Sequence, residues 1–178
     1  MTDLRLYAMI DSCGFIEQLL EQGKHDLYHN KISDLIEHEN IQMVICPIID
    51  YEVVDKIIKT VKEMDCEKNS STIYYGQKNE CQEYTRLLFN YKSLLEKYQC
   101  KMLLPERNFN EILEMCYAKL RLGGSVDETD RDRLILAIAI SNGCKYFITG
   151  DEKIKDEQET LNKYFNNSIK IIYIESYH

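Results

Sequence analysis

The stretch DRDRLILAIAISNGCKYFITGD, residues 130–151, decides the fold. Seven consecutive apolar residues at 134–140 are followed by a short gap with a glycine, a run of strand formers at 146–149, and an aspartate. This pattern predicts a buried helix that leads into a buried strand. Because an unpaired carboxylate is difficult to remove from water, the acids at both ends of this buried unit need an explanation.

Short apolar runs alternate with helical patterns over the rest of the chain. The runs with the length of buried strands lie at residues 4–10, 41–46, 102–104, 146–149 and 169–174. Besides the helix of the opening stretch, helical patterns lie at residues 12–22, 25–39, 47–64, 80–99, 109–124 and 157–165. This alternation is typical of a parallel sheet with helices on both faces. We therefore predict an α/β protein of three layers, α/β/α, with a central parallel sheet.

The length of 178 residues suits one domain with a sizeable core. We predict a single domain over residues 1–178, in which residues 65–80 lose all periodicity and form a mobile loop or an insertion. No apolar run approaches the roughly 20 residues that span a bilayer, and the N-terminal residues lack the pattern of a secretory signal. Seven cysteines without a C-x-x-C spacing predict free, buried thiols. We therefore expect a cytoplasmic protein without a membrane segment.

Four acids lie where such a fold places its ligand site. Crossovers between parallel strands are right-handed, so the carboxyl ends of the strands and the N-termini of the following helices share one edge of the sheet. The acids at this edge are Asp11 and Asp151 after two strands, Glu52 in the helix after the second strand, and Asp132 at the start of the helix in the opening stretch. We predict that their carboxylates converge on one site.

Each of these acids also has a purely structural explanation, because helix N-termini and turns favour acids. Asp50 and Asp55 compete with Glu52 for the second position. Asp130 competes with Asp132 for the third. As a group, however, the acids need more, since two carboxylates about 4 Å apart repel by about 4 kcal/mol at an effective dielectric near 20. Protonation or a cation relieves this repulsion, and oxygen ligands without a His or Cys set favour Mg²⁺ or Mn²⁺ over zinc.

Three segments resemble the PIN domain, a family of metal-dependent ribonucleases. They are LYAMIDSCGFIEQLL at 6–20, CPIIDYEVVDKI at 46–57, and the opening stretch. The opening stretch is the most specific, because PIN domains typically show an Asp, an alanine-rich apolar helix, a short gap, an apolar strand and then Thr-Gly-Asp. The resemblance covers nearly the whole chain, and residues 65–80 match least.

The resemblance implies hydrolysis of RNA phosphodiester bonds with metal ions. One cation would lower the pKa of a bound water, and a second would steady the departing oxygen. The family's acidic site, with Mg²⁺ or Mn²⁺, would fall on Asp11, Glu52, Asp132 and Asp151. Ser12 and Thr149 would support the site as hydroxyl groups near the metal, whereas Cys13 departs from the Asn of many family members.

The net charge of −8 opposes RNA binding over the whole surface. Local cations meet this objection, since we expect phosphates to be held by residues that flank two of the proposed ligands, namely Arg131, Arg133, Lys153 and Lys155. The alternative for these four residues is ordinary solvation at the surface. Tyr74 and Tyr75 either stack on unpaired bases or pack their loop onto the body of the protein.

Bacterial members of the family that the chain resembles are often the toxin of a toxin–antitoxin pair, and they commonly dimerise. The resemblance therefore implies an antitoxin partner and a homodimer, while the added length at residues 65–100 leaves an RNA-processing nuclease open. One rival is another Mg²⁺-dependent phosphoryl hydrolase, whose usual D-x-D after the first strand is absent here. The other is a non-catalytic binding module, which crowded carboxylates oppose because they reduce stability unless a cation uses them.

Overall fold

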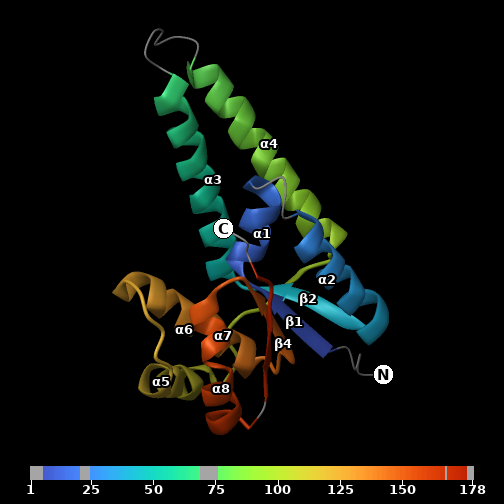
Figure 1. Cartoon of the computed structure of the whole chain (residues 1–178), viewed down its shortest axis with the longest axis vertical. Coiled ribbons are helices and arrows are strands. Elements are labelled where there is room, and N and C mark those ends of the chain that lie inside the picture. The colour runs from blue at the N-terminus through green and yellow to red at the C-terminus, as the bar shows by residue number, and fades with distance from the viewer. Residues whose placement is uncertain (1–5, 21–24, 69–75, 167, 176–178) are drawn as a thin grey trace.

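The computed structural model describes residues 6–20, 25–68, 76–166 and 168–175. The strands in these residues are β1 (Leu6–Ile10), β2 (Ile41–Ile45), β3 (Lys101–Met102), β4 (Tyr146–Thr149) and β5 (Lys170–Tyr173). The helices are α1 (Ser12–Leu20), α2 (His25–Glu39), α3 (Pro47–Lys68), α4 (Gly76–Lys97), α5 (Phe109–Lys119), α6 (Val126–Ser141), α7 (Glu152–Asp156) and α8 (Gln158–Tyr164). Figure 1 shows how these elements are arranged.

The described strands run parallel in one sheet, in the order β3-β2-β1-β4-β5. β1 is central: Met9 stands opposite Val44 of β2 on one side and Phe147 of β4 on the other. These three side chains are fully buried. Strands that are buried on both faces read as nearly continuous apolar runs, which is why the sequence pattern reveals them. The predicted central parallel sheet is confirmed.

Helices cover both faces of the sheet, as predicted. The connections from β1 to β2 and from β2 to β3 run in one direction and carry α1–α4 on one face. The chain then crosses back to β4 and continues to β5, so right-handed connections place α5–α8 on the opposite face. Figure 1 shows the first group of helices above the sheet and the second group below it. The protein is therefore a three-layer α/β/α structure.

Aromatic residues fill the core between the sheet and the first group of helices. Phe15 of α1 is fully buried, and its ring meets that of Tyr91 of α4 edge to face, with 5.4 Å between the ring centroids. Tyr28 of α2 is also fully buried. Large buried rings of this kind contribute much of the apolar area that leaves water on folding, and they hold α1 firmly at the end of β1.

Residues 130–151 form the predicted helix and strand, but the helix begins earlier than expected. α6 starts at Val126, after Ser125, whose Oγ accepts the backbone N–H of Glu128 at 3.4 Å. The apolar residues 135–140 are buried, and so is the whole of β4. Asp132 therefore lies in the second turn of α6, and its predicted position at the helix start is wrong. The field of the helix N-terminus, which acts within the first turn, does not account for this acid.

Residues 65–80 differ from the predicted loop. α3 continues to Lys68 and α4 begins at Gly76, so residues 65–68 and 76–80 are helical. The two helices lie side by side and project from the body of the protein (Figure 1). Residues 65–68 and 76–80 are mostly polar, so the apolar period that reveals the rest of each helix is lost there. Residues 69–75, with Tyr74 and Tyr75, lie outside the described residues.

Other boundaries shift by a few residues. The helix predicted over 109–124 ends at Lys119, where Leu120 adopts extended backbone with φ −81° and ψ 132°. Gly124 follows with φ 141°, a conformation that favours glycine. The strand predicted at 102–104 is the shorter β3, and the described part of the first strand is β1. Within the described ranges, no helix has the length and apolar character to cross a membrane.

Candidate active site

The sheet has a topological switch point between β1 and β4. The connections from these neighbouring strands leave in opposite directions, toward β2 and toward β5, and the crevice outside such a point is where parallel sheets bind ligands. Asp11 directly follows β1, and its backbone N–H donates to the Ile148 carbonyl at 2.9 Å. Asp151 caps α7 after β4, since its Oδ1 accepts the backbone N–H of Lys153 at 2.8 Å. Two of the predicted acids thus flank the switch point.

Asp11 is a buried carboxylate, with 5% of its surface exposed. Its Oδ1 accepts the Ser12 backbone N–H at 2.7 Å, and its Oδ2 accepts the Thr149 hydroxyl at 2.7 Å and the Cys13 thiol at 3.4 Å. Burial raises the pKa of Asp11, and the charge of Asp151 adds to this against the lowering effect of the hydrogen bonds. The carboxylate is therefore held firmly in a place that favours a proton or a cation beside it.

Glu52 lies in the second turn of α3 and reaches toward the same site. Burial raises the pKa of Glu52, a hydrogen bond with Ser12 lowers it, and the charge of Asp11 raises it again. The Glu52 Oε1 atom also lies 3.4 Å from Arg131 Nε of α6. This acid therefore connects the β1 end of the site with α6.

The acids that compete with the predicted ligands are engaged elsewhere. Asp50 accepts a hydrogen bond from the Tyr91 hydroxyl of α4 at 3.0 Å. Asp55 forms an ion pair of 2.7 Å with the lysine one turn further along α3. Asp130 Oδ1 lies 3.5 Å from a terminal nitrogen of Arg133. These contacts give each competing acid a structural role and leave Glu52 and Asp132 as the better candidates.

The pKa of Asp132 is raised to about 7. Burial is the main cause, and the charges of Asp11, Asp151 and Glu52 raise the pKa further. Lys153 acts in the opposite direction. Among the residues that the structure describes, no hydrogen bond reaches the Asp132 carboxylate. A partly buried acid with this pKa keeps its proton in part of the molecules near neutral pH, and a cation would displace that proton.

The four acids act on one another across the switch point. The charge of Asp11 raises the pKa of Glu52 and of Asp132, and the charge of Asp151 raises that of Asp11. The side chains do not form a ready-made ligand set, because in the described part of the chain no three His, Cys, Asp or Glu residues are grouped closely enough to hold a metal ion.

The chemistry of the donors fits Mg²⁺ or Mn²⁺. All four candidate ligands are carboxylates, and hard divalent cations prefer oxygen. Burial raises the pKa of the Cys13 thiol well above its usual value, so this sulfur keeps its proton and is a poor metal ligand. A cation would also offset the like charges that raise the pKa of Asp132. The cysteines whose bonding the structure describes are all free, as predicted: Cys13, Cys46, Cys100, Cys116 and Cys144.

The two predicted hydroxyl residues each bond to an acid of the site. Thr149 is fully buried, and its hydroxyl donates to Asp11 Oδ2 at 2.7 Å. The same Oγ1 accepts the backbone N–H of Asp151 at 3.0 Å. Ser12 hydrogen-bonds to Glu52. Both hydroxyls therefore hold acids in position, whichever ion the acids bind.

The Cys13 thiol and the Tyr28 phenol lie behind the acids, in hydrogen-bonding roles that the sequence does not predict. Cys13 Sγ accepts the backbone N–H of Gly150 at 3.0 Å and lies 3.7 Å from the hydroxyl oxygen of Tyr28. A Cβ atom at Gly150 would stand 2.5 Å from that hydroxyl oxygen. Cys13 is thus a hydrogen-bonding residue of the site, where the sequence pattern predicts a plain buried thiol. The position of Cys13, two residues after Asp11, is the signal in the sequence that could have indicated this role. No feature of the sequence indicates that Tyr28 lies at the site.

Two of the four predicted phosphate ligands lie beside the acids. Arg131 meets Glu52, as described above, and has 35% of its side chain exposed. Lys153 is close enough to lower the pKa of Asp132. A Cβ at Gly124 would lie 3.0 Å from Lys153 Nζ, so this glycine leaves room for the lysine next to the start of α6.

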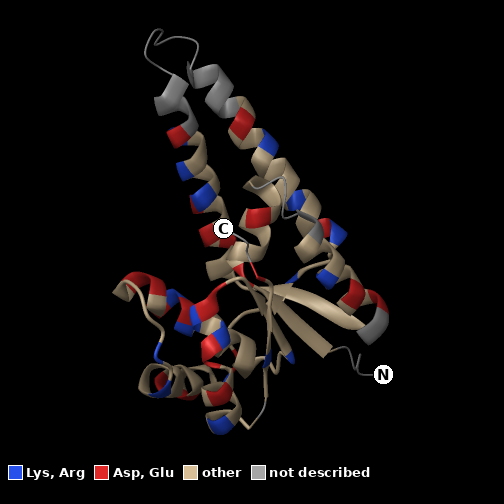
Figure 2. Cartoon of the chain, viewed as in Figure 1, with Lys and Arg blue, Asp and Glu red and all other residues tan. Residues whose placement is uncertain are grey.

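The other two predicted phosphate ligands pack on tyrosine rings. The Arg133 guanidinium lies 5.2 Å from the centre of the Tyr117 ring, and 14% of its side chain is exposed. Lys155 Nζ lies 4.4 Å from the centre of the Tyr173 ring. Figure 2 shows that Lys and Arg are interspersed with Asp and Glu along α3 and α4 and do not form a continuous basic face there. The positively charged groups near the acids are therefore individual residues and not part of a continuous basic surface along these helices.

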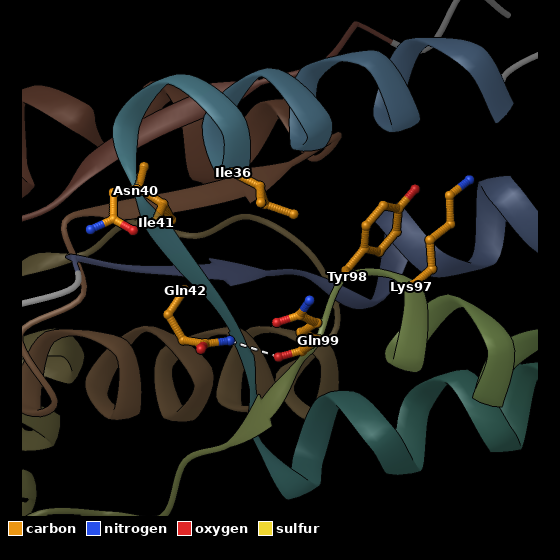
Figure 3. Close-up of a pocket in the computed structure, with 7 residues that line it drawn as sticks. All are labelled: Ile36, Asn40, Ile41, Gln42, Lys97, Tyr98 and Gln99. Carbon is orange, nitrogen blue, oxygen red and sulfur yellow. Dashed lines mark hydrogen bonds between the residues drawn. The ribbon is translucent and has the colours of Figure 1, made fainter. Parts of the chain in front are cut away.

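A separate hollow of about 190 Å³ lies at the other edge of the sheet, where β2 begins (Figure 3). The side-chain amide of Gln42 crosses it and donates to the Gln99 carbonyl at 2.6 Å. The hollow is lined by Ile36, Asn40, Ile41, Gln42, Lys97, Tyr98 and Gln99. None of these residues is an acid, so the chemistry predicted from the sequence belongs to the switch point and not to this hollow.

The sequence matches no protein-family model and no curated protein. Among solved structures, the chain is similar to one in the crystal structure of VapBC2 from Rickettsia felis bound to a DNA fragment from their promoter. The TM-score is 0.56 with 15% sequence identity, over 93% of this chain and 98% of that chain. At this level of identity the likeness shows the fold, which is the PIN-like α/β/α arrangement that the sequence predicts.

Proposed function

We propose that the protein is an endoribonuclease that uses Mg²⁺ or Mn²⁺ to hydrolyse phosphodiester bonds of RNA. The observation that carries the proposal is the group of four carboxylates at the switch point, in which the pKa of Asp132 is raised to about 7. Burial and like charges that shift pKa values in a crevice are typical of functional sites. The fold shared with the VapBC2 chain supports a nuclease of the PIN type.

Asp11 and Asp151 are the principal ligands in this proposal. Thr149 donates to the Asp11 carboxylate and accepts the backbone N–H of Asp151, so it ties one ligand to the backbone of the other. When bound, Mg²⁺ or Mn²⁺ supplies a water of lowered pKa and neutralises charge on the phosphate. Preorganised ligands of this kind limit the rearrangement that the reaction requires.

Asp132 and Glu52 complete the site and orient the attacking water. Both are raised in pKa, mainly by burial, so each gains from a neighbouring positive charge. Arg131 and Lys153 stand next to these two acids and hold the RNA phosphate that is cleaved. The cations also offset the overall negative charge of the protein where the substrate arrives.

The proposal includes a place in the cell. The nuclease acts in the cytoplasm as a homodimer, either as a toxin held by a small antitoxin protein or as an RNA-processing enzyme. The VapBC2 neighbour, solved with DNA from its promoter, supports the antitoxin partner. A small reading frame directly upstream of the gene is the expected companion of a toxin.

The direct test is incubation of the pure protein with end-labelled RNAs, single-stranded and structured, in Mn²⁺, in Mg²⁺ or in chelator. We expect cleavage that requires the divalent ion and disappears in Asp11→Asn. Circular dichroism checks that this variant keeps its fold. Asp50→Asn is the matched control. Asp50 also lies in α3, but it accepts a hydrogen bond from Tyr91 and is not one of the four candidate ligands.

Three results would contradict the proposal. Cleavage that persists in chelator would indicate a contaminating or metal-independent nuclease. Hydrolysis of small phosphate esters without RNA cleavage would favour another phosphoryl hydrolase. Tight RNA binding without turnover in either metal would favour a non-catalytic binding module.

A further inference from the structure

Gln42 is a buried polar residue in a strand that is otherwise apolar. Its exposed fraction is 5%, and the other residues of β2 are buried and apolar. Its side-chain nitrogen donates to the Gln99 carbonyl at 2.6 Å and to the Met43 carbonyl at 3.1 Å, so both amide hydrogens are used. In the part of the chain that the structure describes, no donor reaches the Gln42 Oε1 atom. An unpaired acceptor in a buried side chain costs stability, so this oxygen needs a donor that the described residues do not supply.

Gln42 lines the hollow of about 190 Å³ beside the start of β2 (Figure 3). An apolar cavity of about 150 Å³ admits benzene, so the hollow has room for a single flat ring. Its lining residues come from the end of α2, the start of β2 and the end of α4. Tyr98 is held in place at one wall, because its buried hydroxyl donates to Gln18 Oε1 at 2.6 Å. The hollow is thus preformed, as ligand sites usually are.

Two more side-chain amides line the hollow, on residues with left-handed backbone. The φ angle is 50° at Asn40 and 49° at Gln99, a conformation that favours glycine at the end of a helix. At the end of α4 the Gln99 N–H donates to the Glu96 carbonyl and the Cys100 N–H to the Leu95 carbonyl. Glycine would close both helices with less strain, so the backbone does not explain the two amides. Residues held in strained backbone gather at ligand sites.

The charges around the hollow favour a neutral ring with an N–H donor on its inner side. α2 ends at Glu39 and α4 at Lys97, and the C-terminal end of a helix carries partial negative charge. None of the lining residues is an acid, so a full cation would have no counter-ion there. Lys97 is the one lining residue with a charge, and it is exposed, with Nζ 5.9 Å from the centre of the Tyr98 ring. It is therefore placed to hold a phosphate at the mouth of the hollow.

We propose that the hollow binds a nucleotide whose base carries an exocyclic amino group, as cytosine does. The amino group donates to Gln42 Oε1, the amides of Asn40 and Gln99 meet the other polar atoms of the base, and Lys97 holds the phosphate. A free nucleotide and a nucleotide of an RNA strand share this chemistry. The site is separate from the four acids, so the inference goes beyond the proposed function and does not depend on it.

The test compares the binding of cytidine monophosphate (CMP) and uridine monophosphate (UMP) to the wild-type protein in chelator, by calorimetry. The two bases differ along one edge, where cytosine has an amino group and uracil has a carbonyl oxygen. That carbonyl would face Gln42 Oε1 with no hydrogen between the two oxygens. We therefore expect CMP to bind about tenfold more tightly than UMP, or more, as for a lost buried hydrogen bond. Shifts of the side-chain amide signals of Asn40 and Gln99 in NMR spectra locate the bound nucleotide.

Two variants identify the binding groups. Gln42→Leu removes the acceptor and should abolish the preference for CMP over UMP, with urea unfolding as the check on its fold. Lys97→Ala should weaken CMP binding and leave the binding of cytidine, which has no phosphate, unchanged. This second variant keeps its fold even where Gln42→Leu does not, because Lys97 is exposed. Lys92→Ala is the matched control, since Lys92 is an exposed lysine of the same helix that does not line the hollow.

Short oligocytidylate and oligouridylate distinguish the two sources of the base. Tighter binding of oligocytidylate than of CMP assigns the site to an RNA strand, and equal or weaker binding assigns it to a free nucleotide.

Equal affinity for CMP and UMP, or no binding of either, would overturn the inference. So would an unchanged CMP affinity in Lys97→Ala, or NMR shifts confined to residues around the four acids. These measurements use no divalent ion and no cleavage, so each of these results leaves the endoribonuclease proposal intact. The absence of Mn²⁺-dependent cleavage of every RNA would overturn that proposal and leave the nucleotide site in place.

Discussion

The hydroxyl of Thr149 donates a hydrogen bond of 2.7 Å to Asp11 Oδ2, although 138 positions of sequence separate the two residues. The same oxygen accepts the backbone N–H of Asp151 at 3.0 Å. A single buried side chain thus holds the ends of two neighbouring strands and two of the candidate ligands. This contact gives a structural reason for a hydroxyl residue at position 149, directly before Gly150 and Asp151.

Thr149→Val keeps the shape of this side chain and removes both hydrogen bonds. We expect the protein to lose about 1–3 kcal/mol of unfolding free energy, because a buried acceptor and a buried donor are left without this partner. We also expect the affinity for Mn²⁺ to fall about 10–100-fold, as it does when a residue that orients a metal ligand is removed. Urea unfolding and calorimetric Mn²⁺ titration measure the two effects.

Thr129→Val is the control for that experiment. Thr129 is also buried, at 6% exposure, and its hydroxyl donates to the Val126 carbonyl within α6 at 3.1 Å. The control should change stability by less and leave Mn²⁺ affinity unaltered. Equal Mn²⁺ affinity in Thr149→Val and the wild type would show that Thr149 has no part in orienting the ligands.

The sequence predicts the sheet and the positions of its acids well, for a physical reason. Strands that are buried on both faces must be apolar, and the hand of the crossovers then determines which strand ends share an edge. Asp11 and Asp151 follow directly from these two constraints. The choice of Glu52 as the second acid follows less directly from the sequence, because Asp50 is an equally acceptable candidate there. Only the structure shows that Asp50 is hydrogen-bonded to Tyr91.

Three features escape the sequence pattern. The helical turns at residues 65–68 and 76–80 are mostly polar and leave no apolar period to detect. The start of α6 was masked by the apolar run at 134–140, although Ser125 and Glu128 have the spacing of a capping box. The contact of Tyr28 with Cys13 depends on how α2 packs, and tertiary packing of this kind leaves no local signal.

Gly150→Ala tests the close approach of Tyr28 to the Thr-Gly-Asp turn. The added Cβ would lie 2.5 Å from the Tyr28 hydroxyl oxygen and 3.3 Å from Glu17 Oε1, so one of these groups must move. Because Tyr28 is fully buried, we expect a loss of about 1–3 kcal/mol, the usual effect of overpacking. The measurement is chemical unfolding in chelator.

Tyr28→Phe removes the hydroxyl and makes room for the added methyl group. The double variant with Gly150→Ala should therefore lose less than the sum of the two single changes, with a coupling of about 1 kcal/mol. Strict additivity would show that the methyl group is accommodated without displacing Tyr28.

Asp132→Asn should stabilise the metal-free protein at neutral pH. The folded-state pKa of Asp132 is about 7 against 3.8 for the ordinary side chain, so between these values the folded state binds more protons than the unfolded state. The unfolding free energy therefore falls as pH rises from about 4 to about 7. Removal of the charge recovers on the order of 1–3 kcal/mol above pH 7 and nothing below pH 4.

Unfolding in urea and chelator, repeated between pH 4 and pH 8, measures this difference. Asp130→Asn is the control, because Asp130 pairs with Arg133 and its loss should not stabilise the protein. If Asp132→Asn were less stable than the wild type at pH 8 in chelator, the acid would not be strained by its neighbours in the metal-free protein.

The same proton competes with the metal ion, which gives the affinity for Mn²⁺ a predictable pH dependence. Ligands must be deprotonated to bind a cation, and the Asp132 pKa of about 7 places that step near neutrality. Burial also raises the pKa values of Asp11 and Glu52, which adds to the effect. We therefore expect the apparent affinity to fall up to about tenfold per pH unit below pH 7 for each proton displaced.

Calorimetric titration in two buffers of different ionisation enthalpy reports the protons released when Mn²⁺ binds. Release should be largest at about pH 6 and small at pH 8, because Asp132 is already ionised there. Asp132→Asn should bind Mn²⁺ more weakly and with a shallower pH dependence, whereas Asp130→Asn keeps the wild-type slope. An affinity that stays constant from pH 6 to pH 8 would mean that the ion binds without Asp132, and the acid would then serve the site through the attacking water alone.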